Sequence, residues 1–176
     1  NQILEIKEIQ HPALIQYLKF RKVYEQKHLV KEIHYELKGR KYFWIGFQNN
    51  SGGFEIRNTY AKICIGKKDV TLIGNEDNPQ NEIVIFEGFF DYLTYRNLDK
   101  SNSITCDFLI LNSIALLRKN IELINKYESI QAYFDHDDAG KSATNFLETE
   151  LKTKVKNDSN FYKNFKDLNE FIIFEK

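Results

Sequence analysis

Several residue types and patterns are scarce in this 176-residue chain, and each scarcity excludes a class of protein. Two prolines and eight glycines exclude collagen-like repeats, proline-rich linkers and low-complexity tracts. The longest uninterrupted apolar runs have four residues, too few for a membrane span or for the core of a signal peptide. Cys64 and Cys106 lie 42 positions apart, which excludes a zinc ribbon. We therefore expect a cytoplasmic protein with no membrane partner, kept in a reducing compartment.

Methionine is absent altogether, even from position 1. We therefore expect the chain to be an excerpt of a longer protein, so that further motifs can lie outside it. The composition itself, 42% hydrophobic and 28% charged, is that of an ordinary globular protein. Its length fits one domain or two small ones.

Charge is balanced over the whole chain but not along it. Residues 1–80 carry 13 Lys and Arg against 9 Asp and Glu, a net charge of +4, whereas residues 81–176 carry 12 against 16, a net charge of −4. Chance composition is one explanation. The other is a basic surface for a polyanion beside a carboxylate-rich site for metal ions.

The apolar pattern changes at the same place in the chain. In the first part, Pro12 favours the start of the first of one or two short helices. Apolar and polar residues then alternate with a period of two over residues 33–72, interrupted by a turn signal at residues 49–53. We therefore expect residues 1–80 to form short helices followed by an antiparallel meander, whose last strand lies around Val70.

The second part alternates strand and helix signals. Continuous apolar runs, which predict strands buried on both faces, occupy residues 83–86 and 108–111, and a third strand is expected at residues 130–134. Helical periodicity follows each strand, at residues 90–98, 114–127 and 139–151. This order predicts a parallel sheet flanked by helices, with right-handed crossovers. The fold class is thus α/β for this part and α+β overall, with predicted domains at residues 1–80 and 81–176.

Acidic side chains follow two of the three predicted strands. Glu87 ends the first strand, with Asp91 one helical turn beyond, and Asp135 and Asp137 follow the third. Because the carboxyl ends of parallel strands meet at one edge of a sheet, we expect these carboxylates to converge. Asp135 and Asp137 are two residues apart in extended chain and should point to the same side. A set of oxygen ligands that repel one another suits Mg²⁺ or Mn²⁺.

The structural alternative is that these acids cap helices or lie in their first turns, where negative charge is favourable. This alternative explains Asp138 well and Asp91 in part. It does not explain Glu87 at the end of a strand, nor the pair Asp135 and Asp137. We therefore favour a metal site.

Three neighbours of the acids are expected to support the site. Gly88 and Gly140 are expected to permit close backbone approach where a strand turns into a helix. His136, between the two aspartates, is interpreted as a packing or loop residue, because its side chain should point away from theirs.

These motifs resemble those of the Toprim domain. Residues 87–91 (EGFFD) resemble its E-G-x-x-D turn, and residues 135–140 (DHDDAG) resemble its D-x-D-x-A-G motif. Residues 166–170 (KDLNE) resemble the late K-D-x-N-[DE] element of primase-type and mobile-element Toprim proteins. Residues 111–113 fall where the family has a small polar loop. Together and in order, the motifs make residues 82–176 similar to a Toprim domain.

The first part of the chain resembles the small basic subdomain ahead of Toprim in the polymerase core of bacterial replicative primase. The similarity rests on residues 46–49 (GFQN), residues 52–57 (GGFEIR) and the lysines that follow, and is greatest to the short primase-like proteins of plasmids and other mobile elements. The sequence departs from full replicative primases in two respects, because it shows neither their zinc-binding domain nor their third, helical subdomain. A topoisomerase would need a nucleophilic tyrosine in a separate domain, and none is recognisable.

The resemblance implies a DNA primase that uses Mg²⁺ or Mn²⁺ to build short RNA primers from ribonucleoside triphosphates on single-stranded DNA. It leaves a replicative helicase open as a further partner. It implies catalytic roles for Glu87, Asp91, Asp135 and Asp137, and metal binding by Glu87, Asp135, Asp137 and Asp167. Glu87 is either a metal ligand or the general base. The residues implied to bind template or triphosphate are Arg57, Lys62, Lys67 and Lys68.

Two other functions stay open at this point. One is a metal-dependent Toprim nuclease, against which the basic first part argues. The other is a non-catalytic DNA-binding module of a mobile element. The retained acids argue against that module, because neutral residues would relieve their mutual repulsion.

Overall fold

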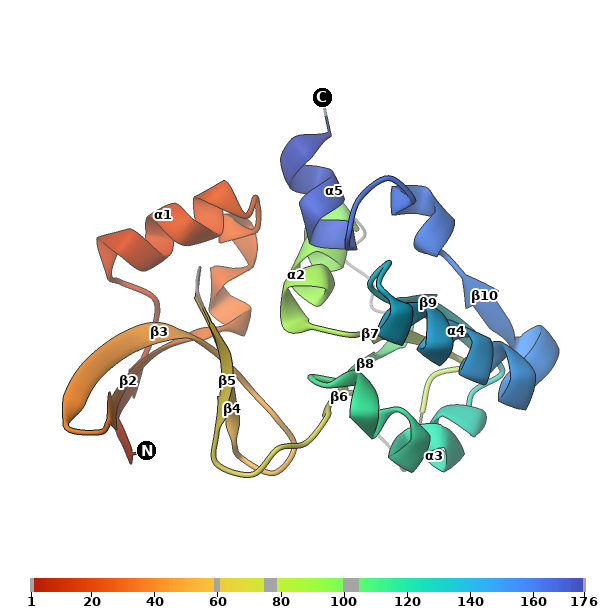
Figure 1. The fold of residues 1–176 in the computed structure, drawn as a ribbon, viewed down its shortest axis with the longest axis horizontal. Coiled ribbons are helices and arrows are strands. Elements are labelled where there is room, and N and C mark those ends of the chain that lie inside the picture. Colours follow the sequence, from red (N-terminus) through yellow and green to blue (C-terminus); the bar gives the residue numbers. More distant parts are fainter. Residues whose placement is uncertain (1, 59–60, 75–78, 100–104, 176) are drawn as a thin grey trace. The chain divides into compact units, whose positions relative to one another are not determined.

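The computed structural model describes the chain except for residues 1, 59–60, 75–78, 100–104 and 176. The chain divides into two compact units, Asn1–Asp69 and Val70–Lys176, each built on its own five-stranded sheet (Figure 1). No helix in the described ranges is long and apolar enough to cross a membrane.

The first unit is an antiparallel sheet in the order β1-β2-β3-β4-β5. Its strands are β1 (Gln2–Lys7), β2 (Lys31–Leu37), β3 (Arg40–Gln48), β4 (Phe54–Arg57) and β5 (Lys62–Ile65). Helix α1 (Pro12–Phe20) and the 3₁₀ helix η1 (Tyr24–Leu29) connect β1 to β2. The predicted short helices and the meander from β2 to β5 are confirmed.

Helix α1 begins where the sequence indicates. Pro12 occupies its first turn, and His11 Nδ1 accepts a hydrogen bond from the backbone N–H of Ala13 at 3.2 Å. Leu14 and Leu18, one helical turn apart, are buried, so one face of the helix packs into the first unit.

The second unit carries a mixed sheet in the order β10-β9-β7-β8-β6. Its parallel strands are β7 (Glu82–Phe86), β8 (Asp107–Ile110), β9 (Ser129–Tyr133) and β10 (Val155–Asn157). The remaining strand, β6 (Thr71–Ile73), pairs antiparallel with β8 at one edge.

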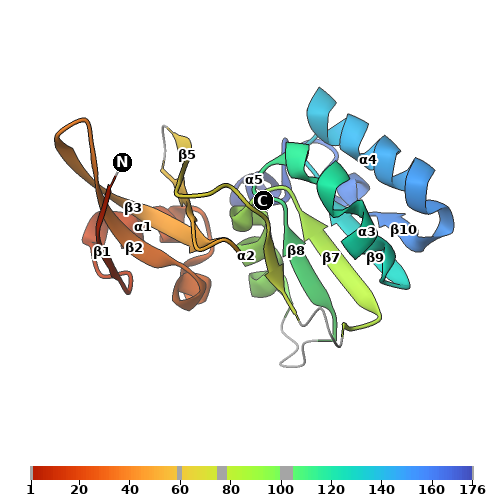
Figure 2. The same cartoon turned by 90° about the horizontal axis from the view of Figure 1, so that it is seen from below.

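Helices cover both faces of this second sheet (Figure 2). One face packs against α3 (Ile121–Asn125) and α4 (Asp138–Leu151), and the core between them contains Ile83, Leu109 and Ile130. On the other face, Phe86 and Phe108 contact the aromatic side chains of α2 (Phe89–Leu98). The last helix is α5 (Leu168–Phe174), preceded by two short 3₁₀ helices, η4 (Lys152–Lys154) and η5 (Ser159–Tyr162).

Three details of the second unit differ from the sequence-based expectation. The strand near Val70 does not extend the first meander, because Thr71–Ile73 pairs with β8. The compact units therefore divide after Asp69, whereas the predicted domains divide after residue 80.

The helix expected over residues 114–127 is broken into η2 (Ile114–Leu116), η3 (Arg118–Asn120) and α3. Asn120 explains the break, because its side-chain amide donates to the carbonyl of Leu116 at 2.9 Å and competes with helical hydrogen bonding.

The turn between β3 and β4 is held by one buried side chain. Asn49 is only 4% exposed, and its Oδ1 accepts hydrogen bonds from the backbone N–H groups of Ser51 at 3.1 Å and Gly53 at 2.9 Å. Its Nδ2 donates to the carbonyl of Lys67 at 2.8 Å. Asn49 thus links the turn to the segment that carries the predicted phosphate-binding lysines.

We expect Asn49→Ala to destabilise the first unit by about 3 kcal/mol, because three hydrogen bonds are lost and buried backbone groups remain without partners. Asn49→Asp should also destabilise it, because it keeps the acceptor oxygen but sets a buried carboxylate oxygen against the carbonyl of Lys67. Urea unfolding followed by circular dichroism measures both effects. The matched control is Gln16→Ala on the exposed side of α1, which should change stability by less than about 0.5 kcal/mol. Equal stability of Asn49→Ala and the control would show that the turn does not depend on this side chain.

Candidate functional site

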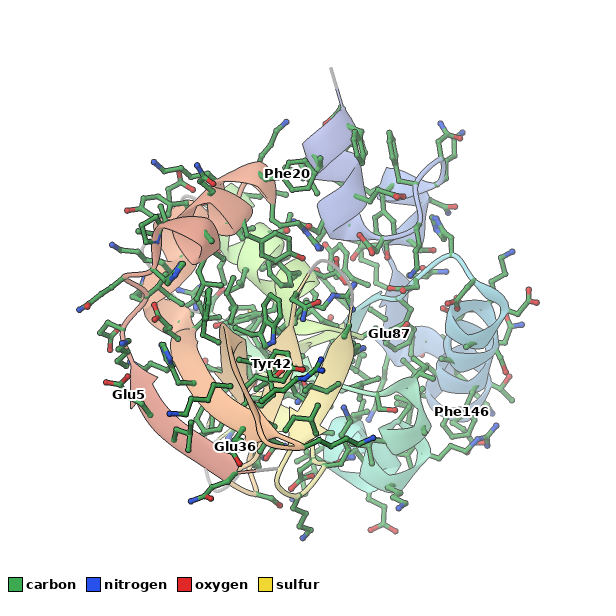
Figure 3. The ribbon with its side chains drawn as sticks, turned by 60° about the vertical axis from the view of Figure 1, so that its left-hand side comes forward. Glu5, Phe20, Glu36, Tyr42, Glu87 and Phe146 are labelled. Carbon is green, nitrogen blue, oxygen red and sulfur yellow. The ribbon has the colours of Figure 1, made fainter. Side chains whose placement is uncertain are left out.

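Glu87 and Asp135 lie side by side at the carboxyl ends of two neighbouring strands. Strands β7 and β9 are parallel, with Phe86 opposite Tyr133, so the residues that follow both strands leave the sheet at the same edge. Glu87 Oε2 accepts a long hydrogen bond from the backbone N–H of Asp135 at 3.4 Å. Figure 3 shows Glu87 beside the loop that leads from β9 into α4.

Asp135 is the acid most affected by its surroundings. Burial is the largest cause that raises the pKa of its carboxyl, and together with the negative charges of Glu87, Asp167 and Asp137 it brings the pKa to about 7. Lys166 acts in the opposite direction, with Nζ 3.6 Å from Oδ2 of Asp135. The lysine is 56% exposed and does not compensate the acids. The negative charges of these acids are therefore not balanced by positive charge at the site.

Asp137 caps the start of helix α4, a role that the sequence analysis assigned to Asp138. Asp137 is the N-cap residue of α4, and its Oδ1 accepts from the backbone N–H of Gly140 at 2.8 Å. Asp138 lies in the first turn and is exposed. The expectation that capping does not explain Asp137 is wrong, because the strand ends before residue 137 and the chain already turns into the helix there. Asp137 still contributes to the raised pKa of Asp135.

Asp167 caps the last helix in a reciprocal arrangement with Glu170. Asp167 Oδ1 accepts from the backbone N–H of Glu170 at 2.7 Å, and Glu170 Oε2 accepts from the backbone N–H of Lys166 at 2.5 Å. This is close to a capping box, in which two helix-end donors are satisfied by the side chains at the two positions. It fixes the start of α5 and places Asp167 where its charge reaches Asp135.

Asp91 joins α2 to α5. Asp91 is 6% exposed, and its Oδ1 accepts from the backbone N–H of Asn169 at 3.0 Å. The Asn169 side chain is fully buried and donates to Oγ1 of Thr94 at 2.7 Å. Thr94 in turn donates to the carbonyl of Phe90 at 2.8 Å. The sequence motif singled out residues 166–170, but only the structure shows that Asn169 fastens this segment to α2.

His136 fastens the Asp135 loop to the segment before α5. Its backbone N–H donates to the carbonyl of Lys166 at 2.7 Å. Its Nδ1 lies 2.7 Å from the carbonyl of Phe165, which requires a proton on Nδ1. The ring also stacks on Tyr162, with centroids 4.8 Å apart. The expected packing role of His136 is confirmed, and through it Asp135 is held close to Lys166.

Gly88 and Gly140 differ in how closely other parts of the backbone approach them. A Cβ on Gly140 would lie 2.0 Å from the carbonyl oxygen of Asp135, so only glycine allows α4 to start this close to the Asp135 backbone. A Cβ on Gly88 would meet no described atom within 4 Å, and its backbone is extended, with φ −133°. The expectation of close approach is thus confirmed for Gly140 and wrong for Gly88.

The donor chemistry of the site fits a hard divalent cation. Among the described residues, no group of three or more His, Cys, Asp or Glu side chains is arranged to hold a metal ion. The raised pKa of Asp135 nevertheless shows carboxylates whose repulsion a cation would relieve. Asp91, Asp137 and Asp167 each already accept a backbone hydrogen bond through Oδ1. Glu87 and Asp135 are adjacent at the ends of β7 and β9 and neither of them caps a helix, so they are the pair that we favour as ligands of an ion.

The predicted phosphate-binding residues belong to the first unit. Arg57 lies opposite Lys62 in the β4–β5 pair, so both side chains are on one face of the sheet. Lys67 and Lys68 follow β5 and are exposed. Lys68 is engaged, however, because its Nζ lies 2.5 Å from Oε2 of Glu55, which is almost fully buried. This ion pair, which the sequence did not predict, leaves Lys68 with a structural role beside any phosphate contact.

Comparisons with known proteins give two family matches. A family model described as Toprim-like matches residues 84–172, and a model described as a domain of unknown function matches residues 3–66. No curated protein matches the chain.

Solved structures give the fold of both units. The primase fragment of the bacteriophage T7 primase-helicase protein is similar with a TM-score of 0.58 and 20% identity, over 96% of this chain and 69% of that one. A second match, with a TM-score of 0.52 and 21% identity, covers 84% of this chain and 78% of its counterpart. It comes from a structure of the T7 lagging-strand DNA polymerase interacting with primase domains bound to an RNA/DNA hybrid and dTTP. At these identities the likeness shows a primase fold.

The pKa of Asp135 predicts how stability depends on pH without divalent cations. Its folded-state pKa of about 7 exceeds the unfolded value of about 3.9, so ionisation opposes folding. This destabilisation is absent below about pH 4 and grows as the pH rises to about 7. Asp135→Asn should therefore be more stable than wild type at pH 8, by at most about 4 kcal/mol, and the difference should vanish near pH 4. Chemical unfolding in EDTA at several pH values measures it.

The matched control for this prediction is Asp138→Asn, one carboxylate removed from an exposed position three residues away. It should show no such pH-dependent gain. A constant difference between Asp135→Asn and wild type at pH 4 and pH 8 would contradict the raised pKa.

Proposed function

The chain belongs to the Toprim-like family, and from this premise we propose that it is the catalytic core of a DNA primase. In this proposal it joins ribonucleoside triphosphates into short RNA primers on a single-stranded DNA template and requires Mg²⁺ or Mn²⁺. The observation that supports the proposal most strongly is the pair Glu87 and Asp135 at neighbouring strand ends, surrounded by further acids.

The chemistry of primer synthesis explains why such a pair is useful. The 3′-hydroxyl of the growing strand attacks an α-phosphate, and negative charge accumulates on the phosphoryl oxygens in the transition state. A divalent cation bound at the site supplies the positive charge that stabilises it. Asp135 holds that cation in this proposal, either together with Glu87 or beside it, and Asp137 and Asp167 add negative charge nearby.

Two further roles follow for residues of the second unit. Glu87 either contributes an oxygen to the cation or takes the proton of the attacking hydroxyl on its carboxylate. Asp91 is a positioning residue in this proposal. It accepts a hydrogen bond from the backbone N–H of Asn169 and so holds the start of α5, where Asp167 lies. Removing Asp91 should therefore disturb the site through α5.

The first unit supplies the polyanion surface in this proposal. Arg57 and Lys62 share one face of the sheet, and Lys67 and Lys68 follow it, so phosphates of the template or of a triphosphate can be bound there. The T7 neighbour was solved with an RNA/DNA hybrid and dTTP, which are ligands of the kinds proposed. The other T7 neighbour belongs to a primase-helicase protein, and we propose a helicase as partner. A plasmid or another mobile element is the proposed origin.

An assay with single-stranded DNA, labelled ribonucleotides and Mg²⁺ tests the function. We expect wild type to make short RNA oligomers, and Glu87→Gln and Asp135→Asn to lose activity by about 100-fold or more, because each removes one of two adjacent carboxylates. The control Asp138→Asn, next to the site and exposed, should keep its activity. Mg²⁺ binding by calorimetry separates the two roles of Glu87. Binding retained in Glu87→Gln with synthesis lost indicates the base, whereas loss of both indicates a ligand.

Two outcomes would contradict the proposed synthesis. Shortened DNA in place of growing RNA would make the chain a nuclease. DNA binding with neither reaction would make it a binding module.

A further inference from the structure

The second unit contains a cavity of about 340 Å³ that none of the candidate site acids lines. It lies on the α2 face of the second sheet, between the end of α2, the end of β9 and the segment from η5 to α5. The lining residues are Tyr95, Leu98, Asp99, Tyr133, Asp158, Phe161 and Leu168. Its volume is at the lower end for small-molecule pockets, which suits a single side chain better than a nucleoside triphosphate.

The walls of the cavity are aromatic and held in place by packing. The rings of Tyr95 and Tyr133 meet edge to face with centroids 5.6 Å apart. Tyr133 also stacks on Phe86 at 5.4 Å, and Phe161 meets Phe171 edge to face at 4.9 Å. A ligand that enters therefore meets aromatic side chains that are already fixed in position.

The rim of the cavity is apolar and open to solvent. Leu98 is 46% exposed and Phe161 is 60% exposed, although both are large hydrophobic residues. Exposed apolar residues around a pocket are typical of a protein interaction site, because a partner chain covers them on binding.

The cavity is also electronegative. Asp158 Oδ2 is buried and accepts no hydrogen bond from any described residue, while Oδ1 lies 3.6 Å from Nζ of the exposed Lys156. A buried carboxylate oxygen without a donor is unfavourable, and a donor from a ligand would correct this. Burial, together with charges that include Asp99, Glu82 and Asp158, raises the pKa of Tyr95 to about 12.

We propose that this cavity is the docking pocket for an arginine side chain of a partner protein. The guanidinium is planar, stacks on exposed aromatic rings and offers several donors to carboxylates, so it matches both Phe161 and Asp158. The negative charge of the lining disfavours phosphate ligands, which separates this pocket from the proposed polyanion surface. The exposed Leu98 and Phe161 favour a partner in which the residues next to the arginine are apolar. This inference does not depend on the proposed primase activity.

The test uses two short peptides that differ in one group. The first is acetyl-Leu-Arg-Phe-amide, and the second carries citrulline in place of arginine, which keeps the shape and removes the charge. Each is titrated into the isotope-labelled 176-residue chain and followed by NMR. We expect the arginine peptide to shift the amide signals of Tyr95, Tyr133, Asp158 and Phe161, and to bind about tenfold more tightly than the citrulline peptide.

Variants of the chain give an independent arm. Asp158→Asn keeps the shape of the side chain and should weaken the arginine peptide about tenfold while leaving the citrulline peptide unchanged. The control Glu150→Gln, an exposed carboxylate on α4 that does not line the cavity, should change neither. The amide spectrum of each variant reports whether it is folded.

Three results would overturn the proposal. Equal affinity of the two peptides would show that charge is not recognised. Arginine amide binding as tightly as the peptide would indicate a small-cation site in place of a protein docking site. Absence of shifts at the cavity up to about 10 mM peptide would exclude a binding site there.

Discussion

The candidate site depends on the parallel pairing of β7 with β9. This pairing sets Phe86 opposite Tyr133 and brings Glu87 and Asp135, 48 residues apart in sequence, to one edge of the sheet. Strand β7 is apolar and buried, and β9 buries Ile130 and Ala132, so a slip in the register of β9 by one residue would bring Gln131 into the core. The hydrophobic core therefore fixes where the acids stand, although the acids themselves oppose folding by repelling one another.

The rest of the second unit stabilises this unfavourable arrangement. His136 ties the loop of Asp135 to the carbonyls of Phe165 and Lys166, and Asn169 ties the start of α5 to Asp91 on α2. Gly140 lets α4 begin against the backbone of Asp135. These contacts are hydrogen bonds and close packing, and they do not depend on the charge of Asp135. The site can thus keep its geometry when the acids are ionised and ready to hold a cation.

Local patterns in the sequence predicted much of this fold. Continuous apolar runs identified β7 and β8, the strand–helix order identified β9, and acids after two of these strands identified the edge where Glu87 and Asp135 meet. Features that depend on distant partners or on irregular backbone were missed. Strand β1 has a bulge between Ile3 and Glu5 that breaks its alternation. The pairing of β6 with β8, and the contact of His136 with Phe165, involve residues far apart in sequence.

The roles of individual side chains show the same contrast between local sequence patterns and partners that are distant in sequence. The motif spacing grouped Asp135 with Asp137, but whether an acid caps a helix depends on where the strand ends, within one or two residues. The resemblance implied that Lys68 binds phosphate, yet Lys68 is paired with Glu55 of strand β4. Composition can indicate that a surface is basic, whereas only the register shows which cations are already paired.

The central claim is that Glu87 and Asp135 together hold a divalent cation at the end of β7 and β9. Anomalous diffraction from crystals grown with Mn²⁺ tests it most directly, because the ion is located without assuming its ligands. We expect an anomalous peak within about 2.5 Å of a carboxylate oxygen of each residue, and no peak at that position in Asp135→Asn. An ordered site with Mn²⁺ bound elsewhere, or with the side chains of Glu87 and Asp135 on opposite faces of the sheet, would contradict the account.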